Sequence, residues 1–341
     1  MSRADVPRGK ARTNLYGLDR PGLAQSVERG GLPVYHAGQI FRWIYHRHEL
    51  DPRNWTDLSN SLRERLALET VVDPGRIADR VTARDRTVKY RVVLPDGKAV
   101  EAVYMEQRSR VTLCISSQVG CALACDFCLT GKMGLVRQLT PGEIVGQVAL
   151  IRRERELDQR AFNIVFMGMG EPLHNYDALT AAIRLLVDPQ GFGLSRRRIT
   201  VSTAGLAPAI ERLGDERHRP RLAVSLNATT DELRSRLMPI NRRYPIARLL
   251  EACRRFADRS KERFTLEYVL LSGVNDGDDE IDRLAGIVRS VPAKLNLIPF
   301  NPVDEWLDYR PPERARVLRA RDRLLAARVP VSIRWSRGVE A

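Results

Sequence analysis

The chain has 341 residues, of which 43% are hydrophobic, so it can bury a large core and is not disordered throughout. Its 56 lysines and arginines against 42 acidic residues leave a formal net charge of +14, which favours a polyanionic partner, although charge alone leaves nucleic acid an open question. The N-terminus lacks the apolar segment of a secretory signal, and no apolar run approaches the ~20 residues of a membrane helix, which predicts a cytoplasmic protein with no membrane partner.

The first third of the chain predicts two small units. Residues 1–15 read as a polar tail, and residues 16–80 as a helical accessory domain. Apolar side chains recur there at helical spacing, as Ile40, Trp43 and Ile44 and again as Leu58, Leu62 and Leu66. Residues 81–106 contain two β-rich runs around Asp96-Gly97, which is the pattern of a β-hairpin linker.

Strands and helices alternate over residues 107–341, the predicted core domain. The strand-like runs are 111–116, 162–168, 197–203, 220–226, 263–271 and 293–299, with a last short run at 330–335. The helical patterns lie at 141–156, 177–187, 207–214, 246–259, 278–290 and 313–328. Six successive βα units predict an α/β fold with a mostly parallel sheet, either doubly wound or curled into an incomplete barrel. Ligands bind such sheets at the carboxyl ends of the strands.

Four of the five cysteines lie between residues 114 and 128, which indicates metal rather than disulfides in a chain without an export signal. Cys121, Cys125 and Cys128 follow the first core strand with the spacing C-x3-C-x2-C. A structural zinc site normally has four ligands, and the nearest downstream histidine is His174, so zinc is the less favoured alternative. Three thiolates suit a 4Fe–4S cluster with one iron left open, which the amino and carboxylate groups of S-adenosylmethionine can chelate.

The segment 112–134 resembles, nearly residue for residue, the cluster loop of the RlmN/Cfr family of radical-SAM RNA adenosine methyltransferases. Other segments similar to that family are 38–47, 100–105, 165–175, 197–206, 222–234, 238–246, 267–276 and 296–302. The resemblance implies an incomplete (βα)6 barrel, a 4Fe–4S cluster and S-adenosylmethionine as cofactors, and methylation of an adenine carbon in ribosomal or transfer RNA. It also implies an electron donor such as flavodoxin, and we expect a monomer.

The resemblance further assigns contacts to S-adenosylmethionine. They are Gly170, Glu171, Ser202, Ser225, Leu226, Asn227 and Asn301. Taken alone, such residues are ordinary turn or cap residues at strand ends. All of them follow or end core strands, where the fold argument independently predicts a ligand. Asn227 is a mild departure, because relatives often carry histidine there.

Two more residues receive catalytic roles from the resemblance. Glu101 in the hairpin is the base that removes the adenine proton, and Cys114 is the thiol that resolves a covalent protein–RNA adduct. By pattern alone, Glu101 is an exposed strand carboxylate and Cys114 a small core side chain.

The family's methyl-carrying cysteine is expected a few residues beyond a motif similar to Ser336-Arg337-Gly338, and the sequence given has no cysteine there. Cys253 is predicted to be a core side chain, because it shares an apolar helical face with Leu249, Leu250 and Phe256. Two alternatives to RNA methylation therefore stay open. One is a radical-SAM enzyme with a different hydrogen abstraction, and the other is a non-catalytic RNA-binding relative.

Overall fold

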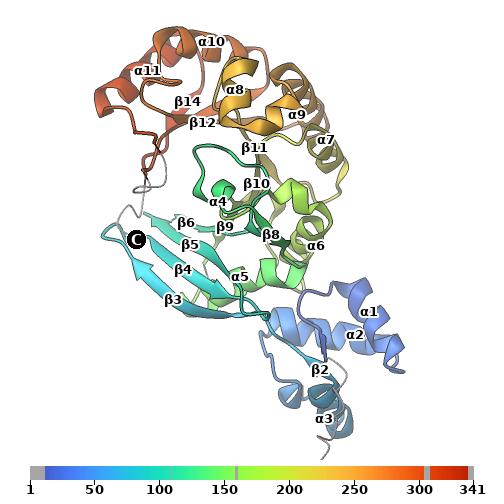
Figure 1. Ribbon diagram of the computed structural model, residues 1–341. Helices are drawn as coiled ribbons and strands as arrows, with labels where there is room; N and C mark the ends of the chain where they lie inside the picture. The colour runs from blue at the N-terminus through green and yellow to red at the C-terminus, as the bar shows by residue number, and fades with distance from the viewer. Residues whose placement is uncertain (1–11, 109, 158–159, 303–307, 337–341) are drawn as a thin grey trace, which may run out of the picture.

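The computed structural model describes residues 12–108, 110–157, 160–302 and 308–336, and its largest feature is a curved sheet of ten strands (Figure 1). The strands follow one another in the order β14-β13-β12-β11-β10-β9-β6-β5-β4-β3. Neighbours from β14 to β6 are parallel, and neighbours from β6 to β3 are antiparallel. Within the described residues the order begins at β14 and ends at β3, so the barrel is incomplete.

The parallel part agrees with the predicted alternation of strands and helices. Its strands are β6 (Arg110–Cys114), β9 (Phe162–Phe166), β10 (Ile199–Thr203), β11 (Arg221–Ser225), β12 (Phe264–Leu270), β13 (Ala293–Pro299) and β14 (Val331–Ile333). The expected helices are α5 (Pro141–Glu154), α6 (Tyr176–Val187), α7 (Ala207–Asp215), α9 (Ile246–Ser260), α10 (Asp278–Arg289) and α11 (Arg314–Ala326). The incomplete (βα)6 barrel is confirmed, with β14 as a further parallel strand at its edge.

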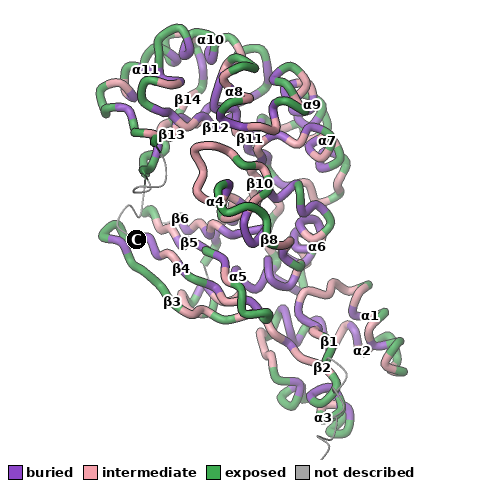
Figure 2. The backbone as a smooth tube through the Cα atoms, in the orientation of Figure 1, coloured by how far each residue is buried: buried purple, intermediate pink, exposed green. Residues whose placement is uncertain are grey.

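Side chains alternate along the strands between a buried face and a half-exposed face. In β6, Val111 and Leu113 are buried, whereas Thr112 and Cys114 are partly exposed, and β9 and β10 repeat the pattern. Successive side chains of a strand point to opposite faces. The buried set packs under the helices on the convex side of the sheet, while the other set lines the concave side, where α4 (Leu129–Lys132) lies (Figures 1 and 2). Polar strand residues therefore gather inside the barrel.

The antiparallel extension contains the predicted hairpin. Strands β4 (Val88–Val93) and β5 (Ala99–Gln107) pair around a turn in which Gly97 has φ +84° and donates its N–H to the Leu94 carbonyl at 2.9 Å. A third strand, β3 (Arg76–Thr82), pairs with β4 and has no counterpart among the predicted elements. The boundaries of the predicted domains stay a prediction.

The N-terminal region is helical, as expected, and contacts the core at close range. It contains β1 (Thr13–Asn14), α1 (Arg20–Arg29), α2 (Tyr35–Phe41), a π turn η1 (Arg42–His46), a 3-10 turn η2 (Pro52–Asn54), α3 (Asn60–Glu69) and β2 (Thr70–Val71). Gly17, at φ +98°, lies against Gly142 of α5, where an added Cβ would be 2.3 Å from the Gly142 nitrogen. Arg20 forms an ion pair with Asp188 after α6 at 2.9 Å.

The remaining elements are short. They are β7 (Gln118–Gly120), β8 (Leu135–Gln138), α8 (Asp231–Leu237) and the 3-10 turns η3 (Pro172–Asn175), η4 (Arg196–Arg198) and η5 (Pro239–Arg242). Among the described residues, no helix is both long and apolar enough to cross a membrane.

Candidate active site

The three spaced cysteines lie in the loop between β7 and α4, on the concave side of the sheet (Figure 1). The Cys121 N–H donates to the Gly134 carbonyl at 2.9 Å, and the Cys128 N–H donates to the Cys125 carbonyl at 3.1 Å. Gly131 of α4 packs so closely that an added Cβ would lie 3.0 Å from the Cys125 nitrogen and oxygen. The backbone of the loop is thus folded tightly around partly exposed thiols.

The cysteines of this loop influence one another's pKa values. Burial raises the pKa of Cys125 to about 12, with further raising contributions from the neighbouring Cys128 and Cys121. Burial also raises the pKa of Cys121, to which the Glu171 carboxylate and Cys128 add. The neighbouring sulfurs therefore disfavour the thiolates of Cys121 and Cys125, and a positively charged group bound there would stabilise both. This donor set, three thiols in one half-buried loop, fits a 4Fe–4S cluster.

Within the described residues, no three side chains of His, Cys, Asp or Glu are arranged to hold a single metal ion. This arrangement is compatible with the cluster, because each of its thiolates binds a different iron.

Glu171 follows the glycine-rich end of β9 and is buried with only 3% of its surface exposed. Its carboxylate accepts the N–H of Leu173 at 3.0 Å and the N–H of Ala204 at 2.7 Å. Burial raises the pKa of Glu171 to about 7 despite these hydrogen bonds. The carboxylate therefore joins the loop after β9 to the loop after β10, at the carboxyl ends of both strands.

The other predicted cofactor residues divide into two groups. Ser202 and Ser225 are partly exposed at the carboxyl ends of β10 and β11, and Asn301 is exposed just after β13. Leu226 is buried in the core, and Asn227 is 1% exposed with φ +58°. The Asn227 side-chain oxygen accepts the N–H of Val269 at 2.8 Å, so this side chain supports the end of β12.

Glu267 is a polar residue of the barrel interior that the sequence analysis does not single out. It is 6% exposed, and burial raises its pKa. Its carboxylate accepts the Ser202 hydroxyl at 3.3 Å and pairs with the Arg334 guanidinium at 3.3 Å. The available signal is that Glu267 is the one charged residue in the otherwise apolar or uncharged strand β12.

Cys114 and Glu101 lie close to each other on neighbouring strands. Cys114 pairs in register with Val103 of β5, two residues from Glu101 on the same face of that strand. The Glu101 carboxylate is exposed and lies 4.0 Å from the Lys89 ammonium. The structure thus brings together the two residues for which the resemblance predicts late catalytic roles.

Arg334 follows β14, and its side chain reaches a residue of strand β12 and the residue that follows β9, near Cys114. Its guanidinium lies 3.8 Å from the Met167 sulfur after β9, and the Cys114 thiol hydrogen-bonds to the Met167 backbone. Burial raises the pKa of Cys114 to about 12, the positive charge of Arg334 lowers it, and the carboxylates of Glu267 and Glu101 raise it. Arg334 is therefore the nearby charge that favours the thiolate.

We expect Arg334→Met to slow alkylation of Cys114 by iodoacetamide roughly tenfold at pH 8.5, because one removed cation raises a thiol pKa by about one unit. Glu101→Gln should accelerate it, since a carboxylate that disfavours the thiolate is lost. Peptide mass spectrometry of the cluster-loaded protein measures the labelled fraction. Faster alkylation in Arg334→Met would mean that the arginine only shields the thiol.

Cys253 lies in the core, as predicted. It is fully buried on α9, and burial raises its pKa to about 12. We expect Cys253→Ala to leave cofactor cleavage and methyl transfer within twofold of the parent protein, because a buried thiol cannot reach RNA. Product analysis by liquid chromatography checks this, and loss of methyl transfer with an intact cluster would contradict it.

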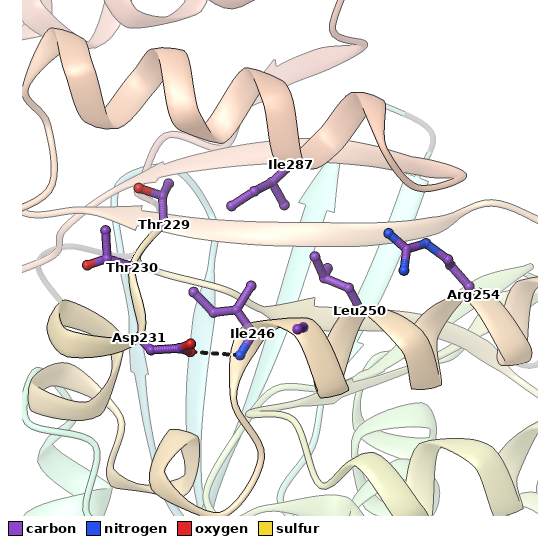
Figure 3. Close-up of a pocket in the computed structure, with 8 residues that line it drawn as sticks. Thr229, Thr230, Asp231, Ile246, Leu250, Arg254 and Ile287 are labelled. Carbon is purple, nitrogen blue, oxygen red and sulfur yellow. Dashed lines mark hydrogen bonds between the residues drawn. The ribbon is translucent and has the colours of Figure 1, made fainter.

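A separate cavity of about 470 Å³ opens between α8, α9 and α10 (Figure 3). It is lined by Thr229, Thr230, Asp231, Ile246, Ala247, Leu250, Arg254 and Ile287. The Asp231 carboxylate is engaged at its edge, where it accepts the Ile246 N–H at 2.8 Å. None of the predicted site residues lines this cavity, so the candidate active site is the barrel interior.

Comparisons with known proteins agree with this geometry. The model of the radical SAM superfamily matches residues 115–285, and that of the ribosomal RNA large subunit methyltransferase N-terminal domain matches residues 13–72. The dual-specificity RNA methyltransferase RlmN of Anaeromyxobacter sp. (strain Fw109-5) is 46% identical over 340 residues, which cover 98% of this chain and 90% of that protein. This chain belongs to the RlmN/Cfr family.

Two further proteins are similar to this chain over nearly its whole length. The protein of the same name from Geobacter sulfurreducens is 46% identical, over 96% of this chain and 89% of its own length. The crystal structure of a radical SAM methyltransferase from Sphaerobacter thermophilus has a TM-score of 0.90 at 43% identity and covers 96% of both chains. Radical SAM proteins use a 4Fe–4S cluster and S-adenosylmethionine, which decides against zinc as the resident metal.

Proposed function

We propose that this chain methylates an adenine carbon in RNA by radical-SAM chemistry, with ribosomal and transfer RNA as its substrates. The observation that carries the proposal is the shared interior of the barrel, where the cysteine loop, Glu101 and Cys114 lie on the concave side of one sheet. The relatives named dual-specificity RNA methyltransferase support the substrate class. Their similarity over nearly the whole chain favours this function over both alternatives.

In this proposal Cys121, Cys125 and Cys128 hold the cluster. The S-adenosylmethionine site is formed by Gly170, Glu171, Ser202, Ser225, Leu226, Asn227 and Asn301. Leu226 and Asn227 contribute backbone atoms there, because their side chains are buried and the Asn227 amide is occupied by strand β12. When bound, the cluster and S-adenosylmethionine together supply one-electron chemistry that removes a hydrogen atom from an unactivated C–H bond.

The protein's own side chains then manage protons and the covalent adduct. Glu101 is exposed on the inner face of β5 and takes the proton from the adenine carbon, which requires an accessible carboxylate. Cys114 pairs with Val103, two positions from Glu101, and would release the RNA by forming a disulfide with the family's carrier cysteine. The sequence given contains no cysteine after Cys253 that could be this carrier. The residues 337–341, which include most of the motif that precedes the family's carrier cysteine, lie outside the described residues.

The domain division belongs to the same proposal: an accessory domain at 16–80, a hairpin linker at 81–106 and a core at 107–341, after a polar tail at 1–15. The accessory domain serves RNA docking in this view, and the match of residues 13–72 to a methyltransferase N-terminal domain supports it. A monomer, a low-potential electron donor such as flavodoxin and a cytoplasmic location complete the proposal.

Mass spectrometry of RNA from a strain that lacks this protein tests the function. We expect a methylated adenosine to disappear from ribosomal RNA, transfer RNA or both, and to return when the chain is expressed again. In vitro, the three functions give different products: methylated adenosine, 5′-deoxyadenosine without methylated RNA, or neither. An unchanged set of methylated adenosines in the deletion strain would refute the proposal.

RNA binding should weaken steeply with salt. The net charge of +14 implies several phosphate contacts, each of which releases counterions, so we expect affinity to fall at least tenfold between 50 and 200 mM salt, on the order expected for a few such contacts. Fluorescence anisotropy with a structured RNA measures this. An affinity that stays flat over this range would show that the basic surplus does not contact RNA.

A further inference from the structure

Arg234 is a fully buried arginine beside the strand ends of the candidate active site. It lies on α8, and its exposed fraction is 0%. Its guanidinium donates to the carbonyls of Ala204 at 2.7 Å, Ser225 at 3.0 Å and Leu226 at 3.1 Å. These carbonyls follow or end β10 and β11, so one side chain ties together the strand ends that carry the proposed cofactor contacts.

Arg234 makes its hydrogen bonds to neutral oxygens, and the Asp231 carboxylate reaches it only through Asn241, whose amide donates to Asp231 at 3.0 Å. The fourth hydrogen bond of Arg234, at 2.9 Å, goes to the side-chain oxygen of Asn241, and among the described residues no carboxylate accepts a hydrogen bond from the guanidinium directly. A buried cation without a paired anion is costly, and here burial lowers the pKa of Arg234 to about 10. A structural clamp could be built from neutral amides at lower cost, which indicates that the charge itself has a use.

The cysteine loop is the neighbouring group that can use this charge. Cys125 packs against a small apolar cluster that includes Leu237 of α8, and the Asp126 N–H donates to the Leu237 carbonyl at 2.9 Å. The helix that carries Arg234 is therefore fixed directly to the loop of the three cysteines. The thiolate of Cys125 also heads the charges that act on Arg234.

We propose that Arg234 supplies the buried positive charge that faces the iron–sulfur cluster and raises the reduction potential of that cluster. This inference rests on the proposed function only in that a 4Fe–4S cluster is bound by the three cysteines. Reduction adds an electron to a cluster already held by three thiolates, so a fixed cation nearby favours the reduced state. The same charge has little solvent screening, because the guanidinium is fully buried.

The test is a redox titration of the anaerobically reconstituted protein, followed by electron paramagnetic resonance, with neither S-adenosylmethionine nor RNA added. Arg234→Gln keeps one amide group that can donate to a strand-end carbonyl but removes the charge. We expect its ratio of reduced to oxidised cluster to fall about tenfold at a fixed ambient potential, equal to a midpoint about 59 mV lower for one electron. Arg234→Lys keeps the charge and should stay within threefold of the parent protein.

Arg236→Gln is the matched control, because Arg236 is an exposed arginine of the same helix and water screens its charge. Its midpoint should equal that of the parent protein. If Arg234→Gln titrates like the parent, or Arg234→Lys falls as far as Arg234→Gln, charge is not the role of Arg234 and the proposal is wrong. Loss of the cluster in Arg234→Gln, alone or together with Arg234→Lys, would mean that Arg234 serves to hold the site together, and the proposal would be wrong.

These outcomes are separate from the failure of the proposed function. A parent protein that binds zinc and no iron would refute the proposed function. A parent protein that cleaves S-adenosylmethionine and methylates RNA, beside an Arg234→Gln variant of unchanged midpoint, would overturn only the role of Arg234.

Discussion

Cys125→Ala should abolish both the iron–sulfur cluster and the cleavage of S-adenosylmethionine. In the proposed site each of the three thiolates would hold one iron, and Cys125 packs against an apolar cluster that offers no replacement ligand. After anaerobic reconstitution, the parent protein should contain about four irons per chain and the variant less than about one. Formation of 5′-deoxyadenosine should fall below detection, at least 1000-fold by the order of magnitude that loss of an essential group costs.

Cys253→Ala is the matched control, because it removes one thiol from the core without touching the loop. It should bind as much iron as the parent protein. Stoichiometric zinc with no iron in the parent protein, or a reducible cluster in Cys125→Ala, would contradict the assignment of these ligands.

The sequence predicts the core elements well because their patterns are locally strong. Strand β12 has a buried apolar or aromatic residue at every second position, and α9 carries Leu249, Cys253 and Phe256 on one apolar face. Strand β3 was missed for a physical reason: most of its residues are exposed, and its sequence RIADRVT mixes charges with only a few apolar residues. Its strand conformation comes from pairing with β4 at the sheet edge, which no local pattern encodes.

Helix α8 was missed because seven residues are too few for a clear helical period. Thr230 caps the N-terminus of α8, and its hydroxyl accepts the Leu233 N–H at 3.3 Å. A threonine at this position is a sequence signal for a helix start, but the helix that follows is too short to confirm it by its periodicity.

In the candidate site, too, residues with a local sequence pattern could be predicted, whereas contacts between residues far apart in the sequence could not. The spacing of Cys121, Cys125 and Cys128 is local, and so the sequence alone indicates a metal cluster. The contact between Arg334 and Met167 joins residues 167 positions apart, and that between Ser202 and Glu267 spans 65 positions. Such contacts arise only when the sheet curls, since the partners belong to different strands. The resemblance predicted Ser202, whereas its partner Glu267 had no signal beyond an isolated charge in a strand.

Gly170→Ala should destabilise the protein and impair cofactor binding, because the conformation and the space at this position both require glycine. Gly170 has φ +99°, and an added Cβ would lie 2.5 Å from the Gln118 Cβ and 2.8 Å from the Gln118 nitrogen. Gln118 cannot move aside cheaply. It is fully buried, its side-chain oxygen accepts the Glu171 N–H at 2.7 Å, and its amide donates to Gln138 at 2.8 Å.

Backbone strain of this kind costs about 1–3 kcal/mol, and the clash adds to it, so we expect the free energy of unfolding of Gly170→Ala to fall by about 3 kcal/mol. Gly286→Ala is the matched control. Gly286 is exposed on α10 with nothing within 4 Å of an added Cβ, and alanine there should raise stability by about 0.5–1 kcal/mol. Urea unfolding measures the stability of both variants.

The loop of Gly170 also places Glu171 between the ends of β9 and β10. We therefore expect Gly170→Ala to bind S-adenosylmethionine at least tenfold more weakly, which corresponds to a loss of ~1.4 kcal/mol of binding free energy. Equal stability and equal affinity in the two alanine variants would show that the loop after β9 tolerates a side chain and is not shaped around the cofactor.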